Sequence, residues 1–152
     1  ISHANPSFFH KSKRNIDTDI LKKLVNKNGF IGLSLYPYHL KNLGDCTIED
    51  FCEMIKELVN LIGEDNIGIG SDLCLNWPDD VVMWMRNGKW TKNIDYGESK
   101  DKNPKWPKLP SWYKQPSDLN NLFNLLCENN IPEKVSTKII GQNWFNFMKN
   151  QF

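Results

Sequence analysis

The first half of the chain alternates between helical and strand-like patterns of apolar residues. One set of apolar residues recurs at helical spacing and predicts a helix with a single apolar face. These residues are Ile20, Leu21, Leu24 and Val25. Asn15 or Asp17 can cap the start of this helix, and Asn28-Gly29 ends it. Residues 30–36 (FIGLSLY) are short, apolar and preceded by a glycine, which is typical of a buried strand.

A second helix and strand follow in the same order. Thr47 is a suitable N-cap, and Asp50 occupies the capping-box position three residues later. The apolar face of this helix consists of Phe51, Met54, Ile55, Leu58, Val59, Leu61 and Ile62. Gly63 ends it, and residues 67–70 (IGIG) predict a second buried strand. If the first residues are the tail of a strand, this β-α-β-α-β order predicts a parallel sheet with helices packed outside it.

A tryptophan-rich insert at residues 73–116 breaks the alternation. It holds five of the six tryptophans, Trp77, Trp84, Trp90, Trp106 and Trp112. A short helix is expected at 79–87, and the remainder is expected to be a long loop of the kind that forms binding loops or lids. The tryptophans can stack against sugars or cover an apolar pocket, or they can form the local core of an ordered loop. After the insert we expect three helices, at residues 117–128, 132–140 and 142–149, with Pro132 at the first position of its helix.

Composition narrows the class of protein. The chain has 152 residues, of which 39% are hydrophobic and 24% charged, as in an ordinary globular domain. The net charge of +1 and the lack of a basic stripe argue against a nucleic-acid partner. No apolar run approaches the ~20 residues that a membrane-spanning helix needs. The chain begins at Ile1 without a signal-peptide pattern, so we expect a fragment or a processed product, and the compartment is not indicated beyond a slight preference for the cytoplasm.

The four cysteines do not suggest a metal site. Cys46, Cys52, Cys74 and Cys127 include no pair at C-x-x-C spacing, so a thiolate zinc site is not expected. A disulfide framework is not expected either in a chain this large with so few cysteines. We therefore expect reduced and mostly buried thiols.

Polar residues stand where the pattern places strand ends. Asp72 follows the second strand, where a carboxylate can bind a metal or accept a proton from water, or can merely cap a turn. His3 would reach the same edge of the sheet if Ile1 ends a strand, although a lone terminal histidine is more often a surface residue. Arg14 suits a substrate carboxylate, or belongs to a solvated basic cluster.

The two other histidines carry weaker signals. His10 lies in the same loop as His3, with no ligand spacing around it. His39 follows the first predicted strand and could line its end. We expect both to be ordinary polar-loop residues.

Four short motifs occur along the chain in a fixed order. They are Ser2-His3-Ala4-Asn5, Arg14-Asn15, Gly68-Ile69-Gly70-Ser71-Asp72 and Gly141-Gln142-Asn143-Trp144-Phe145-Asn146-Phe147. Together they resemble the C-terminal part of the membrane dipeptidases (renal dipeptidase family), over nearly the whole chain. That family folds as a (β/α)8 TIM-type barrel of the amidohydrolase kind and hydrolyses dipeptides at a two-zinc centre. The resemblance implies that residues 1–152 form about the last three β/α units of such a barrel.

The resemblance also implies roles for three residues. His3 would be a zinc ligand at the end of the sixth strand, and Arg14 would hold the C-terminal carboxylate of the dipeptide. Asp72 would be the catalytic acid and base at the end of the eighth strand. It would take a proton from a metal-bound hydroxide and pass it to the leaving amine. Asn143 matches a family position that we interpret as structural.

The chain departs from the family in ways that bear on substrate and activity. Leu73-Cys74-Leu75 stands where the family has a second acidic residue, and the aromatic insert resembles that of only one bacterial branch. The other family ligands, a His-x-Asp pair, a bridging glutamate and another histidine, have no counterpart here, so we expect these 152 residues alone to be inactive. An unpaired strand edge could favour a homo-oligomer. An amidohydrolase of another small amide and a non-catalytic module that binds a ligand or partner remain alternatives.

Overall fold

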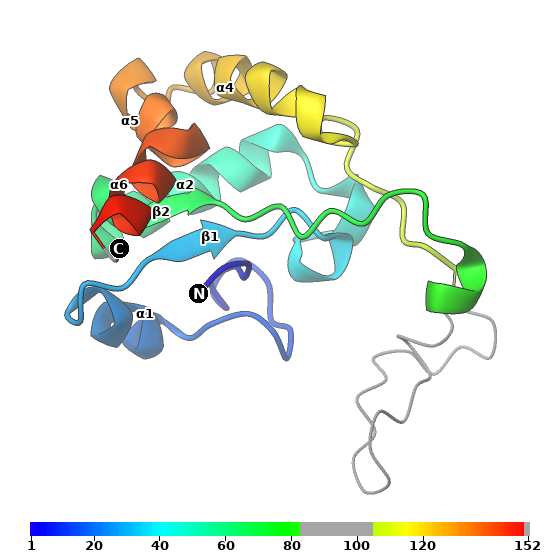
Figure 1. The fold of residues 1–152 in the computed structure, drawn as a ribbon, viewed down its shortest axis with the longest axis horizontal. Helices are drawn as coiled ribbons and strands as arrows, with labels where there is room; N and C mark the ends of the chain where they lie inside the picture. The colour runs from blue at the N-terminus through cyan, green and yellow to red at the C-terminus, as the bar shows by residue number, and fades with distance from the viewer. Residues whose placement is uncertain (83–104, 151–152) are drawn as a thin grey trace, which may run out of the picture. The chain divides into compact units, whose positions relative to one another are not determined.

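The computed structural model describes residues 1–82 and 105–150. The chain forms two compact units, one of residues 1–73 and 108–152 and the other of residues 74–107. Figure 1 shows the first unit as a short parallel sheet surrounded by helices. All the candidate site residues belong to this first unit.

Strands β1 (Ile31–Leu33) and β2 (Ile67–Ile69) form a two-stranded parallel sheet. In its register, Gly32 lies opposite Gly68. The first residues of the chain run along the other edge of β1, where Ala4 N–H donates to Gly32 O at 3.0 Å and Gly32 N–H donates to Ile1 O at 2.9 Å. Three parallel segments therefore lie side by side in chain order, as the β-α-β-α-β pattern predicts.

Helices α1 (Thr18–Val25) and α2 (Ile48–Ile62) connect these segments. Both begin where the sequence predicts, since Asp17 is the N-cap of α1 and the Thr47 hydroxyl of α2 accepts from Asp50 N–H at 3.1 Å. Short 3-10 turns lie at η1 (Pro37–His39), η2 (Leu43–Asp45) and η3 (Glu64–Asn66). The expected capping box is only half formed, because the Asp50 carboxylate accepts from Lys41 Nζ at 2.6 Å.

The predicted strand at residues 30–36 is longer than β1 itself. Regular pairing stops at Leu33, and beyond it the Ser34 N–H donates to the side chain of Asn5 at 3.1 Å. Ser34 N–H also donates to Ala4 O at 3.4 Å, and Leu35 N–H donates to Ser71 O at 3.1 Å, so the Asn5 side chain adds to the backbone partners at this end of the strand. The following residues turn into η1, which begins at Pro37.

The C-terminal helices cover the sheet. The elements are η4 (Pro116–Asp118), α4 (Leu119–Glu128), α5 (Glu133–Thr137), the π-helical turn η5 (Lys138–Gln142) and α6 (Asn143–Lys149). The helix expected at 132–140 is thus divided, and Pro132 is its N-cap rather than its first helical residue. The π turn coincides with contacts of η5 to β2, and Lys138 is bonded to Glu64 and Asp65. We attribute the departure from a regular α-helix to these contacts with β2 and with the residues before it.

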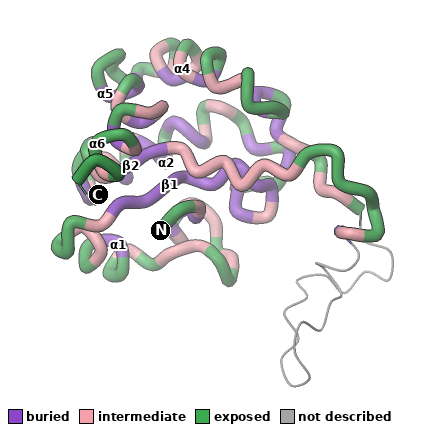
Figure 2. Tube along the Cα trace, in the orientation of Figure 1, coloured by how far each residue is buried: buried purple, intermediate pink, exposed green. Residues whose placement is uncertain are grey.

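The core lies between the sheet and its helices. Figure 2 shows buried residues along β1, β2 and the inner sides of the helices. Phe51 of α2 is fully buried and packs against Trp112, whose indole N–H donates to Cys46 O at 2.8 Å. Burial raises the pKa of both Cys46 and Cys52 to about 12, so these two thiols stay protonated at neutral pH. This agrees with the expectation of buried, reduced thiols at these positions.

The second unit is described only at its ends. Trp106 N–H donates to Trp77 O at 2.8 Å, which joins the two ends of the segment. A helical turn begins at Asp79, but most of the helix expected at 79–87 lies outside the described residues. Trp84 and Trp90 also lie outside them.

Candidate active site

The site lies at the C-terminal ends of the parallel segments. The Ser2 carbonyl lies so close to Gly32 and Gly70 that a Cβ on either glycine would collide with it. The absence of side chains at these two positions lets the N-terminal segment cross close to the strands. Asp72 follows β2 by three residues and adopts a left-handed backbone conformation with φ of 53°. His3 and Asp72 are thereby brought to the same edge of the sheet.

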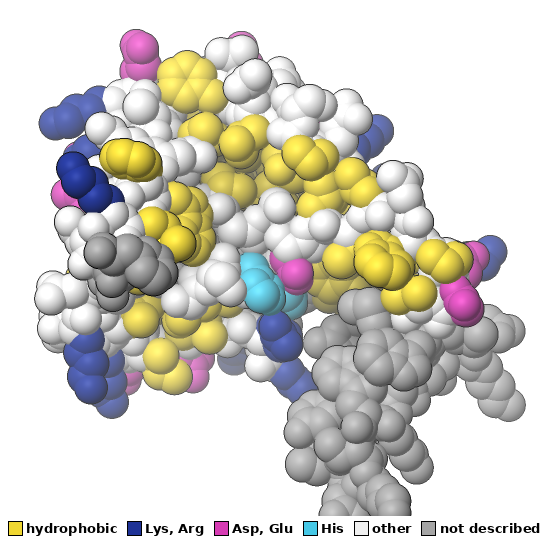
Figure 3. Space-filling view, viewed as in Figure 1, with side chains coloured by type: hydrophobic (Ala, Val, Ile, Leu, Met, Phe, Trp, Pro, Cys, Tyr) yellow, Lys and Arg dark blue, Asp and Glu magenta, His cyan; other side chains and the backbone are white. Residues whose placement is uncertain are grey.

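The three predicted site residues converge. The Nε2 of His3 lies 3.9 Å from Asp72 Oδ1 and 3.4 Å from a terminal guanidinium nitrogen of Arg14. Figure 3 shows a histidine and an acidic side chain next to each other on the surface. The His3 and Asp72 side chains are 36% and 31% exposed, so solvent and a small ligand can reach them.

The contacts of the two ring nitrogens of His3 bear on which of them carries the proton. A guanidinium can only donate, so the Arg14 contact at 3.4 Å suits a His3 tautomer with an acceptor lone pair on Nε2. In that tautomer the ring proton would lie on Nδ1, which is 2.9 Å from the Ser2 hydroxyl. Nε2 is the nitrogen that faces Asp72 and Arg14, and in this tautomer it is available as an acceptor or ligand.

A buried polar cluster lies behind these residues. Asn5, Ser34 and His39 are at most 3% exposed. The His39 Nδ1 lies 2.8 Å from the Ser34 hydroxyl, while Asn5 and Asn15 both donate to the His39 carbonyl. The sequence did not single out Asn5, Ser34 or this role of Asn15, because their contacts join segments that are far apart in the chain.

His39 is a buried histidine at the end of η1, and not the ordinary polar-loop residue that we expected from the sequence. Burial lowers its pKa from 6.5 to about 4, the Asp72 carboxylate opposes this shift, and Arg14, His3 and His10 add to it. The imidazole is therefore neutral at neutral pH. His10 contributes its backbone carbonyl, which accepts from Asn15 Nδ2 at 2.7 Å.

Tyr113 is a further residue beside the site that the sequence did not indicate. Its buried side chain hydrogen-bonds with Ser71, the residue before Asp72, and burial raises its pKa. The last residues of the insert thus return to support the end of β2.

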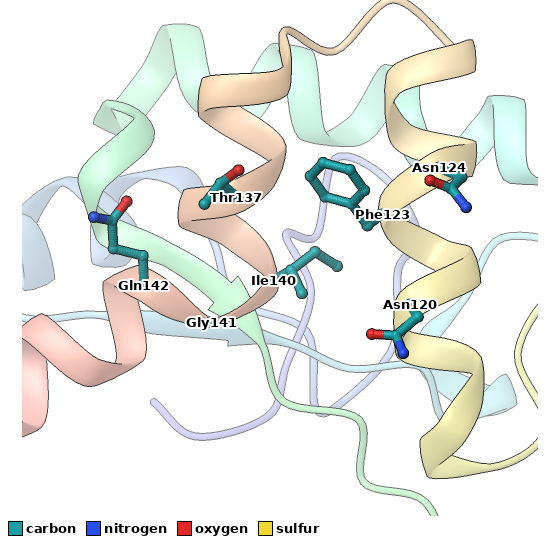
Figure 4. Close-up of a pocket in the computed structure, with 7 residues that line it drawn as sticks. All are labelled: Asn120, Phe123, Asn124, Thr137, Ile140, Gly141 and Gln142. Carbon is teal, nitrogen blue, oxygen red and sulfur yellow. The ribbon is translucent and has the colours of Figure 1, made fainter.

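The groove between α4 and η5 lacks groups suited to catalysis. It encloses about 480 Å³ and is lined by amides, Thr137 and apolar side chains. Figure 4 shows Phe123 from α4 and Ile140 from η5 lying toward each other across it. The Thr137 hydroxyl donates to Glu133 O at 3.0 Å, as is common for a threonine within a helix. The convergence of His3, Arg14 and Asp72 is the better candidate site.

The described residues do not complete a metal site by themselves. His3 and Asp72 are donors of a kind that suits a transition metal, but two donors are fewer than such a site requires. Across residues 1–82 and 105–150 no three His, Cys, Asp or Glu side chains converge to hold a metal ion. In the same part of the chain, no helix has the length and apolar character to cross a bilayer.

Comparison with known proteins agrees with this geometry. The family model of the membrane dipeptidases, peptidase family M19, matches residues 1–79, just over half of the chain. The chain belongs to this family. The matched part includes His3, Arg14 and Asp72, and it confirms the resemblance seen in the sequence motifs.

One protein is similar to the chain in sequence, and a solved structure is similar to it in both sequence and fold. Dipeptidase aclJ of Aspergillus oryzae is 30% identical over 73 residues, which are 47% of this chain and 17% of that protein. An amidohydrolase from Pseudomonas aeruginosa is 29% identical and superposes with a TM-score of 0.81, over 97% of this chain and 43% of that one.

A third relative shows the fold at lower identity. It is a metallopeptidase from Rhodobacter sphaeroides, solved with a phosphinate mimic of the dipeptide L-Ala-D-Ala. It is 17% identical, with a TM-score of 0.67 over 99% of this chain and 35% of that one. The chain therefore spans less than half the length of each of these three relatives.

Proposed function

We propose that this chain supplies one side of the active site of a metal-dependent dipeptidase. The convergence of His3, Arg14 and Asp72 at the ends of parallel segments carries the proposal, together with membership of the dipeptidase family. The three parallel segments and their helices would be about the last three β/α units of a (β/α)8 barrel, in which active sites lie at the C-terminal ends of the strands.

Arg14 is the group suited to recognise the substrate. Its side chain is exposed, and its guanidinium can form two parallel hydrogen bonds with the C-terminal carboxylate of a dipeptide. This contact favours a substrate with a free carboxylate over another small amide. It also limits the length of the substrate, because the carboxylate must lie within reach of Asp72.

Asp72 is the group suited to move the proton. Its carboxylate lies 3.9 Å from His3 Nε2, so it can accept a proton from an attacking water at this edge of the sheet. The same group can then return that proton to the leaving amine, which completes the hydrolysis. Its left-handed backbone conformation and the Tyr113–Ser71 bond would help to keep it in place.

His3 would be one ligand of the metal, through Nε2. The remaining ligands would come from the rest of a longer protein, in which we expect two zinc ions per chain. Bound metal would supply Lewis-acid polarisation of the scissile carbonyl. Metal analysis of the longer protein tests this expectation, and a metal-free protein that still hydrolyses dipeptides would refute it.

The role of Asp72 has a direct test with a matched control. Asp72→Asn in the longer protein should lower kcat for dipeptide hydrolysis by a factor of about 10² or more, with metal content unchanged. Asp65→Asn changes an aspartate before β2, where it pairs with Lys138 at 2.6 Å, and should leave kcat close to that of the unmodified protein. Full activity of Asp72→Asn would disprove the proposed mechanism.

The 152 residues alone should be inactive, because they contribute a single histidine ligand of the expected metal centre. Purified residues 1–152, supplied with zinc, should hydrolyse dipeptides no faster than buffer. Turnover that survives purification would contradict this proposal, since the site would then be complete within the chain.

A further inference from the structure

The segment that joins His3 to Arg14 is a loop with a closed base. Ile16 N–H donates to Asn5 O at 2.8 Å, and Ser7 N–H donates to Ile16 O at 2.8 Å. His3 lies two residues before Asn5, and Arg14 lies two residues before Ile16. The base of the loop thus determines where both functional side chains start.

Two asparagine side chains attach this base to η1, the turn that follows β1. The Nδ2 groups of Asn5 and Asn15 donate to the same acceptor, the His39 carbonyl, at 3.1 and 3.0 Å. A carbonyl oxygen has two lone pairs, so both are used. Asn15 also donates to His10 O at 2.7 Å and accepts from Asn5 N–H at 3.2 Å. The two carboxamides therefore form one connected unit.

Asn5 also continues the sheet beyond the end of β1. Its side chain is fully buried, its Oδ1 accepts from Ser34 N–H at 3.1 Å, and its Nδ2 donates to Ser34 O at 2.9 Å. A carboxylate of the same shape would place an oxygen against two carbonyls and lose the donor. Buried polar groups without partners are costly, so this position requires an amide.

We propose that Asn5 and Asn15 are positioning residues, which hold the loop so that Arg14 stays beside His3 and Asp72. Arg14 is long and exposed, so its backbone position decides where the guanidinium can meet a substrate carboxylate. The effect that we expect on substrate discrimination rests on the proposed dipeptidase function. The effect that we expect on the order of the loop rests on the hydrogen bonds alone.

The kinetic test compares a dipeptide with the same dipeptide bearing a C-terminal amide. The ratio of their kcat/KM values reports the carboxylate contact of Arg14. Asn15→Asp in the longer protein should lower this ratio about tenfold or more. In an Arg14→Met background, Asn15→Asp should leave the ratio unchanged, because the residue through which it acts is gone.

Asn143 provides the matched control. Its Nδ2 also bridges two carbonyls, Glu64 O at 2.7 Å and Ile67 O at 2.8 Å, but at the start of β2 rather than beside Asp72. Asn143→Asp should lower stability without changing the substrate ratio. A merely structural role for Asn15 would give the same result as this control.

Hydrogen exchange separates the two ways in which the inference can fail. The amides of Ser7 and Ile16, which close the base of the loop, should exchange about tenfold faster in Asn15→Asp than in Asn143→Asp, after correction for global stability. If the unmodified protein hydrolyses neither substrate, the dipeptidase proposal fails. If the amides at the base of the loop exchange equally fast in Asn15→Asp and Asn143→Asp, the positioning role is wrong as well. If the protein is active and Asn15→Asp keeps the wild-type ratio, the positioning role is wrong and the dipeptidase proposal stands.

Discussion

His39 should make the stability of the protein depend on pH in a defined window. Its pKa is about 4 in the folded protein, against 6.5 for an exposed histidine, chiefly because the ring is buried. Between these values the unfolded chain binds a proton that the folded protein excludes. The free energy of unfolding is therefore highest above about pH 6.5 and falls as the pH drops toward about 4.

The size of this effect follows from the two pKa values. One pKa unit corresponds to about 1.4 kcal/mol, so the full window is worth about 3 kcal/mol. Between about pH 7.5 and about pH 5, the expected loss from this residue is about 2 kcal/mol. That loss is a large fraction of the stability of a typical domain.

His39→Gln removes the titrating group but keeps the backbone carbonyl that accepts from Asn5 and Asn15. Urea unfolding at several pH values gives the free energy of unfolding of both proteins, and their difference cancels the other titrating groups. Relative to the variant, the wild type should lose about 2 kcal/mol between about pH 7.5 and about pH 5. Measurement at about pH 8 gives the cost of replacing the neutral ring. If the free energies of unfolding of the two proteins changed with pH in parallel, His39 would be protonated as easily in the folded protein as in the unfolded chain, and the reasoning would be refuted.

Two further predictions concern packing. Gly70→Ala should lower the free energy of unfolding by about 1–3 kcal/mol in thermal or urea melts, because its Cβ would collide with the Ser2 carbonyl beside His3. Gly141→Ala meets no atom within 4 Å and should change stability by less than about 1 kcal/mol, so equal effects would contradict this explanation. Phe51→Ala empties a fully buried site against Trp112 and should cost about 3–5 kcal/mol in urea unfolding. A loss below about 1 kcal/mol would show that the core collapses around the gap.

Periodicity predicted the helices that pack by a single apolar face. Helices α1, α2 and α6 lie within a few residues of their predicted ranges, because helical spacing and end signals act locally. The C-terminal region at 132–140 differs, since the π turn η5 lies where the chain contacts β2. A distant strand decided that geometry, and no pattern within the helix could have revealed it.

The candidate site was predictable only in part for the same reason. The strand-end positions of His3 and Asp72 and the spacing to Arg14 were visible in the sequence, and the structure brings the three together. The bonds from Asn5 and Asn15 to the His39 carbonyl span 34 and 24 residues of sequence, respectively. Both asparagines lay within the motifs that resemble the family, and that was the one signal that could have drawn attention to them.

The stability of the protein and the geometry of its site depend on different contacts. Phe51 and its apolar neighbours hold the helices to the sheet, whereas the path from β1 to His3 and Arg14 runs through the carboxamides of Asn5 and Asn15. Apolar contacts are roughly proportional to area and tolerate small shifts, while hydrogen bonds weaken steeply with angle. A small displacement of the loop would therefore weaken these hydrogen bonds and move the Arg14 guanidinium away from a substrate carboxylate, while the apolar contacts of Phe51 stay in place. For this reason, Phe51→Ala should reduce stability alone, while Asn15→Asp should also reduce discrimination between substrates.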